Sequence, residues 1–107
     1  MCDFKQLSSG SEGFVLRCIH CGIFQIAFGG TMMSLHLEAF HQFKKLADHL
    51  SQRSLYADSR HSRCLVIPTP YYGVNLLLQK DELDKLKTLL SAAEDERIVQ
   101  SMLALFS

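Results

Sequence analysis

The chain has 107 residues, of which 48% are apolar and 21% charged, as in an ordinary globular protein. Eleven basic residues balance eleven acidic ones, which argues against nonspecific electrostatic binding to nucleic acid or anionic lipid. The length fits one domain, residues 1–107, and no apolar run is long enough to span a membrane. The N-terminus also lacks the apolar core of a signal peptide, so we expect a cytoplasmic domain that binds neither nucleic acid nor membrane.

The first half of the chain predicts a hairpin and a helix. Residues 13–30 (GFVLRCIHCGIFQIAFGG) are rich in Phe, Val and Ile and carry glycine at both ends, which indicates two strands joined by a turn. Residues 31–37 extend the second strand or begin a third. Residues 38–50 predict a helix, because the apolar residues that follow recur on one helical face: Phe40, Phe43, Ala47 and Leu50.

The second half repeats this order. Residues 51–62 form a polar linker, residues 63–68 predict a short strand that ends at a proline turn, and residues 71–79 predict another strand. Residues 80–106 predict a long helix with acidic residues in its first turn, where they complement the helix dipole. Its apolar face carries Leu83, Leu86, Leu90 and Ala93.

The element order is therefore β-β-α, linker, β-β-α, which predicts an α+β fold with two helices packed on one face of an antiparallel sheet. A shift of 43 residues places Gly30 on Gly73 and Leu35 on Leu78. It also places Phe40 on Leu83, and "CIHC" on "HSRC". These matches suggest an internal repeat, although any two β-β-α units share much of this apolar spacing.

The stretch "CIHCG" is the strongest chemical signal in the chain. Cys18 and Cys21 have the C-x-x-C spacing of a zinc half-site, and Gly22 suits the tight turn that brings two sulfurs to one ion. Two sources of further ligands are open: Cys2 from the N-terminal arm, or His61 together with Cys64. His20 lies between the two sulfurs and is expected to point away from the ion.

Two other interpretations of the cysteine pair remain. It could be redox active, although such pairs usually lie at a helix N-terminus, and no thioredoxin-like pattern surrounds this one. It could also consist of two small apolar residues near a turn, because cysteine is often buried without doing chemistry. The sequence contains no nucleophile motif and no paired acid and base, so it offers no positive sign of an enzyme.

The run from "MCDF" through "GFVLRCIHCGIFQIAFGGTMMSLHLEAFHQF" to "VIPTP" and "LLLQKDELDKLKTLL" resembles a small family of Bacteroidota proteins grouped as a domain of unknown function. The resemblance covers nearly the whole chain, and its most specific part is the early cysteine, the C-x-x-C and the following "FQIAFG". It implies that Cys2, Cys18 and Cys21 belong together as a metal or thiol cluster, and it implies no activity.

The end of the second helix carries an apolar stripe of Ile98, Met102 and Leu105, widened by Val99 and Phe106. A helix of this length is too long for the small core, so we expect a twofold homodimer through the C-terminal helix. The alternative is a break near Ser91 to Ala93, followed by a short third helix that caps the core. Together these features suggest an accessory or regulatory interaction module with a zinc site and a protein partner, or else a thiol-based redox or metal-sensing protein.

Overall fold

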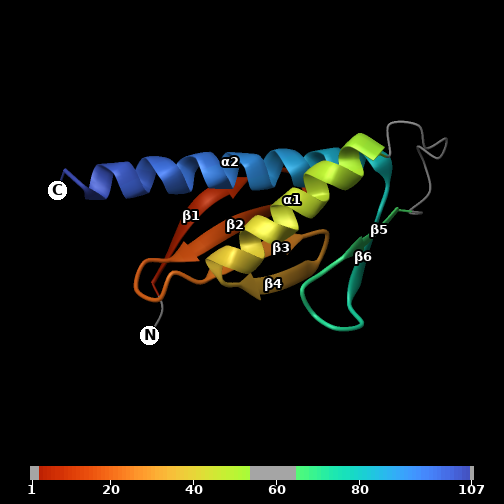
Figure 1. The fold of residues 1–107 in the computed structure, drawn as a ribbon, viewed down its shortest axis with the longest axis horizontal. Coiled ribbons are helices and arrows are strands. Elements are labelled where there is room, and N and C mark those ends of the chain that lie inside the picture. The colour runs from red at the N-terminus through yellow and green to blue at the C-terminus, as the bar shows by residue number, and fades with distance from the viewer. Residues whose placement is uncertain (1–2, 54–64, 107) are drawn as a thin grey trace.

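The computed structural model describes residues 3–53 and 65–106, and it has the predicted α+β class (Figure 1). Four strands come first: β1 (Phe4–Ser9), β2 (Gly13–Cys18), β3 (Phe24–Phe28) and β4 (Thr31–Leu35). Helix α1 (Leu37–Arg53), strands β5 (Leu65–Pro68) and β6 (Asn75–Leu78), and helix α2 (Lys80–Ala104) follow. The four strands before α1 form one antiparallel meander, and β5 pairs with β6 in a separate two-stranded sheet.

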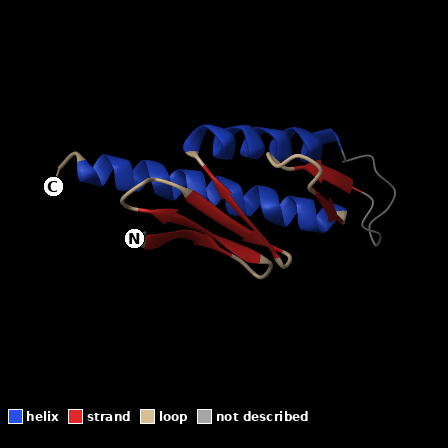
Figure 2. Cartoon of the chain, turned by 90° about the horizontal axis from the view of Figure 1, so that it is seen from below, coloured by secondary structure: helices blue, strands red, loops and turns tan. Residues whose placement is uncertain are grey.

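Both helices lie on the same face of the four-stranded sheet and run antiparallel to each other (Figures 1 and 2). Helix α2 packs over β1 and β2, whereas α1 packs beside it and over β4. The β5–β6 hairpin lies at the end of the molecule where α1 ends and α2 begins, and the Tyr71 hydroxyl donates a hydrogen bond to the Ser34 carbonyl of β4. The predicted arrangement of two helices on one sheet face is therefore confirmed, although the strands divide into two sheets.

Strand β1 is the element that the sequence pattern did not predict. It pairs with β2, but the register shifts between Gln6 and Ser8, so that Leu7 and Ser8 are both buried. Such a bulge breaks the alternation of buried and exposed side chains by which a strand is recognised in a sequence. The Ser8 hydroxyl donates a hydrogen bond of 2.9 Å to the Leu89 carbonyl of α2, which joins β1 to the helix layer.

The core lies between the helices and the four-stranded sheet. Strands β2 and β3 contribute Val15, Phe24 and Ile26 to it, and the Phe24 ring stacks on the Phe40 ring of α1 at 4.5 Å between centroids. The predicted helical faces are the buried ones, with Leu50 packed at the edge: Phe40, Phe43, Ala47, Leu83, Leu86, Leu90 and Ala93. The predicted core is therefore confirmed.

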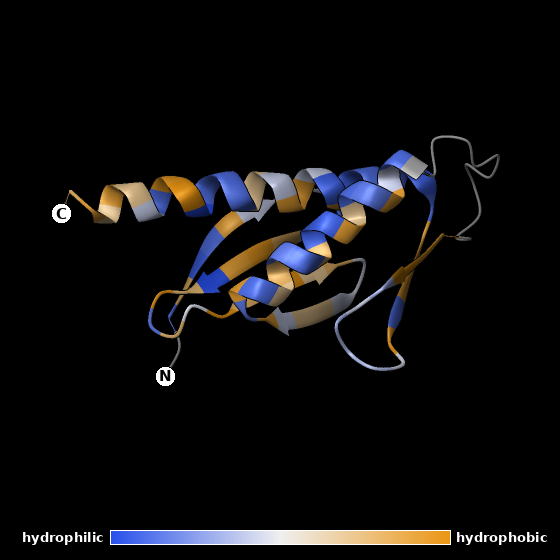
Figure 3. Cartoon of the chain, in the orientation of Figure 1, coloured by the Kyte–Doolittle hydropathy of each residue, from blue (hydrophilic) through white to orange (hydrophobic). Residues whose placement is uncertain are grey.

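Helix α2 runs without interruption from Lys80 to Ala104, so the alternative with a break near Ser91 to Ala93 is wrong. Its start is held by the Gln79 backbone N–H, which donates to the Glu82 carboxylate at 2.9 Å. No residue after Ala93 is buried. The last turns therefore extend beyond the core and end in the apolar segment at the C-terminal end of the chain (Figure 3).

The 43-residue relation seen in the sequence also holds for the elements. It places β4 on β6 and α1 on α2, with the first residues of the two helices coinciding, whereas β3 overlaps β5 only at Ile67 and Pro68. Gly30 and Gly73, which occupy matching turns, both have positive φ, 88° and 77°. Buried residues also coincide, as with Phe24 and Ile67.

The contacts between the two helices follow the same relation. His41 Nε2 lies 2.8 Å from a Glu94 carboxylate oxygen, and the Ser51 hydroxyl donates a 2.9 Å hydrogen bond to Asp84. The shift carries His41 onto Asp84 and Ser51 onto Glu94, so it converts one contact into the other. The 43-residue relation therefore extends to these two contacts between the antiparallel helices.

Candidate functional site

Residues Cys18–Gly22 form a tight turn between β2 and β3, which we call the knuckle. The Cys18 N–H donates to the Ile23 carbonyl at 2.8 Å, and the Gly22 N–H donates to the Cys18 carbonyl at 2.9 Å. Gly22 has a φ of 79°, a conformation that L-residues with a side chain rarely adopt. The glycine after the second cysteine is therefore required by the turn, as the sequence predicted.

The two cysteines of the knuckle differ in exposure. Cys18 is completely buried, whereas Cys21 is exposed. The Cys21 backbone N–H donates to the Cys18 sulfur over 3.5 Å. A donor directed at sulfur stabilises negative charge on it, which is the form that binds a metal or attacks a disulfide. The turn thus directs a backbone hydrogen-bond donor at the buried sulfur and places the exposed cysteine beside it.

Basic side chains surround the knuckle. The Arg17 guanidinium lies 5.4 Å from the centroid of the Phe24 ring, and a Cβ added at Gly22 would be 3.8 Å from Arg17 Nη2. Lys5 of β1 lines the same cavity, which measures about 470 Å³. The opposite wall of this cavity comes from the last turns of α2, through Gln100, Ser101 and Ala104. No pattern in the sequence predicts that the knuckle and the end of α2 share a cavity, because only the tertiary fold brings them together.

The N-terminal arm enters β1 next to the knuckle. The Ile19 N–H donates a hydrogen bond of 2.9 Å to the Asp3 carbonyl, so the residue that follows Cys2 in the chain is held beside the turn. Cys2 itself lies outside the described residues, as do His61 and Cys64. Strand β5, which follows Cys64 in the chain, lies at the other end of the molecule from the knuckle (Figure 1).

A complete metal shell does not form within residues 3–53 and 65–106, where no three His, Cys, Asp or Glu side chains converge. The structure brings together two of the five predicted metal ligands, Cys18 and Cys21, within one turn. His20 lines the same cavity, and the expectation that it points away from the ion stays a prediction.

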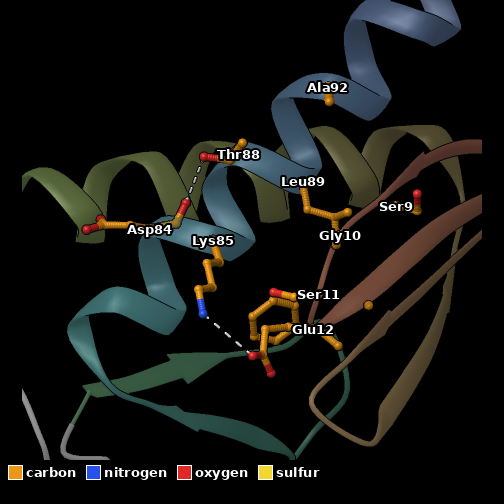
Figure 4. Close-up of a pocket in the computed structure, with 11 residues that line it drawn as sticks. Ser9, Gly10, Ser11, Glu12, Asp84, Lys85, Thr88, Leu89 and Ala92 are labelled. Carbon is orange, nitrogen blue, oxygen red and sulfur yellow. Dashed lines mark hydrogen bonds and ion pairs between the residues drawn. The ribbon is translucent and has the colours of Figure 1, made fainter.

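A second cavity, of about 350 Å³, lies between the β1–β2 turn and α2 (Figure 4). Lys85 Nζ lies 3.6 Å from a Glu12 carboxylate oxygen across its mouth, and the Thr88 hydroxyl is bonded to the Asp84 carbonyl. Leu89, Ala92 and Phe28 supply apolar lining. Its lining includes no cysteine or histidine, and its charged groups are paired, so we assign it no chemistry.

Glu94 is the centre of an ion cluster between the helices. Arg97 Nε donates to both Glu94 carboxylate oxygens, at 3.1 and 3.2 Å, and His41 approaches one of them from α1. Burial acts to raise the pKa of Glu94, but hydrogen bonds and charges from Arg97 and His41 outweigh burial, so the pKa lies below the ordinary glutamate value. The sequence did not predict this cluster, which links residues 53 positions apart.

Comparison with known proteins identifies a family for this chain. Among the described helices, none is both long and apolar enough to cross a lipid bilayer. No curated protein and no solved structure matches the chain. One family model matches residues 1–105, and it is described as a family of unknown function (DUF6686). The resemblance to a domain of unknown function is thereby confirmed, while the Bacteroidota origin stays a prediction. The chain belongs to the DUF6686 family.

Proposed function

We propose that this protein is an accessory or regulatory interaction module of the cytoplasm that pairs with a second copy of itself through the end of α2. The observation that supports the proposal is the segment Ile98–Phe106, which we call the α2 tip. Six large apolar side chains are exposed there: Ile98, Val99, Met102, Leu103, Leu105 and Phe106. Contiguous apolar surface of this kind marks an interaction site.

Length and spacing support pairing between copies. A helix of 25 residues extends about 38 Å, and its buried residues end at Ala93. Ile98, Met102 and Leu105 follow one another at intervals of four and three, the spacing by which two identical helices interdigitate. A twofold axis through the α2 tip would close the assembly, and closed pairs are the commonest oligomers.

The knuckle supports a second element of the proposal, a structural zinc ion. Its described ligands would be Cys18 and Cys21, with Cys2 as the third because the chain enters β1 beside the knuckle. His61 and Cys64 are the alternative partners. The tight turn and the N–H donor directed at the Cys18 sulfur support such a site. Cys18 and Cys21, the two described cysteines, form no disulfide, which suits a reducing cytoplasm.

The second candidate function is thiol-based redox or metal sensing. The exposed Cys21 next to the buried Cys18 is the observation that favours it, because an accessible thiol can react first and its neighbour can then form the disulfide. Elemental analysis of protein purified without chelator separates the two functions. A structural site retains about one zinc per chain, whereas a redox pair is found without metal and is oxidised by a small-molecule disulfide.

Self-association is tested with matched exposed residues. Met102 on the α2 tip and Leu77 on the outer face of β6 are each 56% exposed. Met102→Glu places a charge in the proposed interface, whereas Leu77→Glu places the same charge on an exposed strand. We expect light scattering at micromolar concentration to give a dimer for the wild type and for Leu77→Glu, and a monomer for Met102→Glu.

A monomeric wild type would reject pairing between copies. A dimer that survives Met102→Glu but not Leu77→Glu would move the interface to the β5–β6 hairpin. Circular dichroism of both variants serves as the folding control, since neither side chain is buried.

A further inference from the structure

The last third of α2 lines the same cavity as the knuckle. Beyond Ala93 no side chain of α2 is buried, so this part of the helix is not held by the core. Gln100, Ser101 and Ala104 line that cavity together with Cys18 and Cys21. Other positions of the same segment carry the exposed apolar side chains of the α2 tip. The knuckle and the proposed interface are therefore connected through one helical segment.

Electrostatic interactions at this cavity also link the end of α2 to the knuckle. The last turn of α2 contains no basic residue, although the exposed carbonyls of a helix C-terminus favour positive charge. Lys5 from β1 and Arg17 from β2 supply basic groups at the same cavity, and Arg17 lies beside Gly22 of the knuckle. The basic groups that line this cavity therefore come from β1 and β2, which pair directly beside the knuckle.

We propose that zinc bound by Cys18 and Cys21 orders the last third of α2, so that metal occupancy controls how the α2 tip is presented. The inference rests on the proposed zinc site but not on pairing between copies. Each of the two thiols releases a proton when Zn²⁺ binds, and two zinc–sulfur bonds close a ring through the turn. A turn fixed in this way gives the helix a rigid wall, so the helix loses less entropy when it settles against it.

Hydrogen exchange of the intact protein, read by mass spectrometry, tests the coupling. We compare the protein loaded with one equivalent of zinc and the protein treated with chelator. We expect zinc to slow exchange in peptides covering 94–106 by at least about fivefold, the lower end of ordinary coupling between sites. Peptides from the buried face of α1 should be unchanged, and they show in the same experiment that the fold is intact.

Variants separate an effect of zinc at the knuckle from an effect of pairing between copies on the exchange rate of residues 94–106. Cys21→Ser removes an exposed ligand and should abolish both zinc uptake and the slowing, with α1 peptides again reporting the fold. Met102→Glu, designed to be monomeric, should keep the slowing, because the knuckle acts within one chain. Cys2→Ser and Cys64→Ser identify the source of the third ligand by their zinc content.

Three results would overturn the inference. The first is wild-type protein that holds zinc while exchange over 94–106 stays unchanged. The second is protein that takes up no zinc at all. The third is slowing that disappears in the Met102→Glu variant while its zinc content is normal, because pairing rather than the knuckle would then order the helix. A monomeric wild type that still shows the slowing would reject the proposed pairing and leave this inference standing.

Discussion

Gly13 occupies a point where two strands come unusually close. A Cβ built on this residue would lie 1.8 Å from the Ala27 carbonyl oxygen, and that oxygen belongs to the backbone of β3, which cannot move without disturbing its pairing. Gly13 does not need a positive φ, so the requirement for glycine comes from space alone. Nothing in the sequence distinguishes it from the neighbouring Gly10.

Gly13→Ala should therefore destabilise the protein by about 2 to 3 kcal/mol, the cost of forcing extra atoms into a packed site. Gly10→Ala is the matched control, because the nearest atom to its added Cβ is Leu89 Cδ1 at 4.0 Å. It should be neutral or stabilising by up to about 1 kcal/mol. Urea unfolding of both variants gives the comparison, and equal midpoints would show that β2 and β3 can separate without cost.

The two cysteines of the knuckle also show how little the sequence reveals about the surroundings of a residue, in this case for its chemistry. Their spacing predicts a common site, and the turn around Gly22 agrees with it. Spacing does not reveal that Cys18 is buried and Cys21 exposed, or that a backbone N–H is directed at the Cys18 sulfur. That asymmetry makes Cys21 the residue for substitution, because serine there removes a proposed ligand without opening a cavity.

Among the elements, α1 joins the sheet to α2. Its apolar face stacks Phe40 on Phe24 of β3 and buries Phe43, which is only 2% exposed. Both rings lie on the face predicted from the apolar spacing. Because helical stability in proteins comes chiefly from such packing, we expect α1 to depend on these two rings more than on its intrinsic propensity.

Phe43→Ala should cost about 3 to 5 kcal/mol, through lost burial and the cavity left behind. Tyr72→Ala, which truncates an aromatic ring that is fully exposed at the β5–β6 turn, should change stability by less than about 0.5 kcal/mol. Thermal melts of the two variants measure the contrast. A melting temperature for Phe43→Ala within a degree or two of the wild type would contradict the packing described for α1.

At the scale of the whole molecule, α1 and α2 join the two β-β-α units. Two contacts between these helices place a carboxylate of α2 against a side chain of α1: Asp84 against Ser51, and Glu94 against His41. Burial acts to raise the pKa of Asp84, but hydrogen bonds from Lys80 and Ser51 and the nearby lysine charges outweigh it, so the pKa is lowered, as it is for Glu94. Both contacts between the units therefore favour the ionised carboxylates.

The lowered pKa values of Asp84 and Glu94 predict that the contacts between α1 and α2 stabilise the protein less in acid. A carboxylate whose pKa is lower in the folded state stabilises the protein above the unfolded value, about 4.3 for glutamate, and this stabilisation is lost as the pH falls through the folded value. Glu94→Gln should cost about 1 to 3 kcal/mol at neutral pH, because Arg97 loses its charged partner. It should also reduce the loss of stability between about pH 6 and pH 3.

Urea unfolding at the two pH values measures this difference. Glu38→Gln removes an exposed carboxylate from the first turn of α1 and serves as the control, which should keep the wild-type difference. If Glu94→Gln loses as much unfolding free energy between the two pH values as the wild type does, other groups cause that loss.

The sequence alone determined the α+β class, both helices with their buried faces, the hairpin around the C-x-x-C and the 43-residue relation. These features are local, since each depends on periodicity within one element or on a turn residue such as Gly22. The family also follows from the sequence, over residues 1–105. Strand β1 was not predicted, because its bulge at Leu7 and Ser8 hides the alternation, and its pairing with β2 and packing against α2 are tertiary contacts.

Only the tertiary structure decided what lies next to what. It separated β5 and β6 from the main sheet, joined His41 and Arg97 through Glu94, and kept α2 intact past the end of the core. It also made the last turns of α2 and the knuckle line one cavity, although some 80 residues separate Cys21 from Ala104 in the chain. The physical reason is that such neighbours follow from the joint burial of apolar faces on separate elements. No pattern within a single element records where its face will meet another.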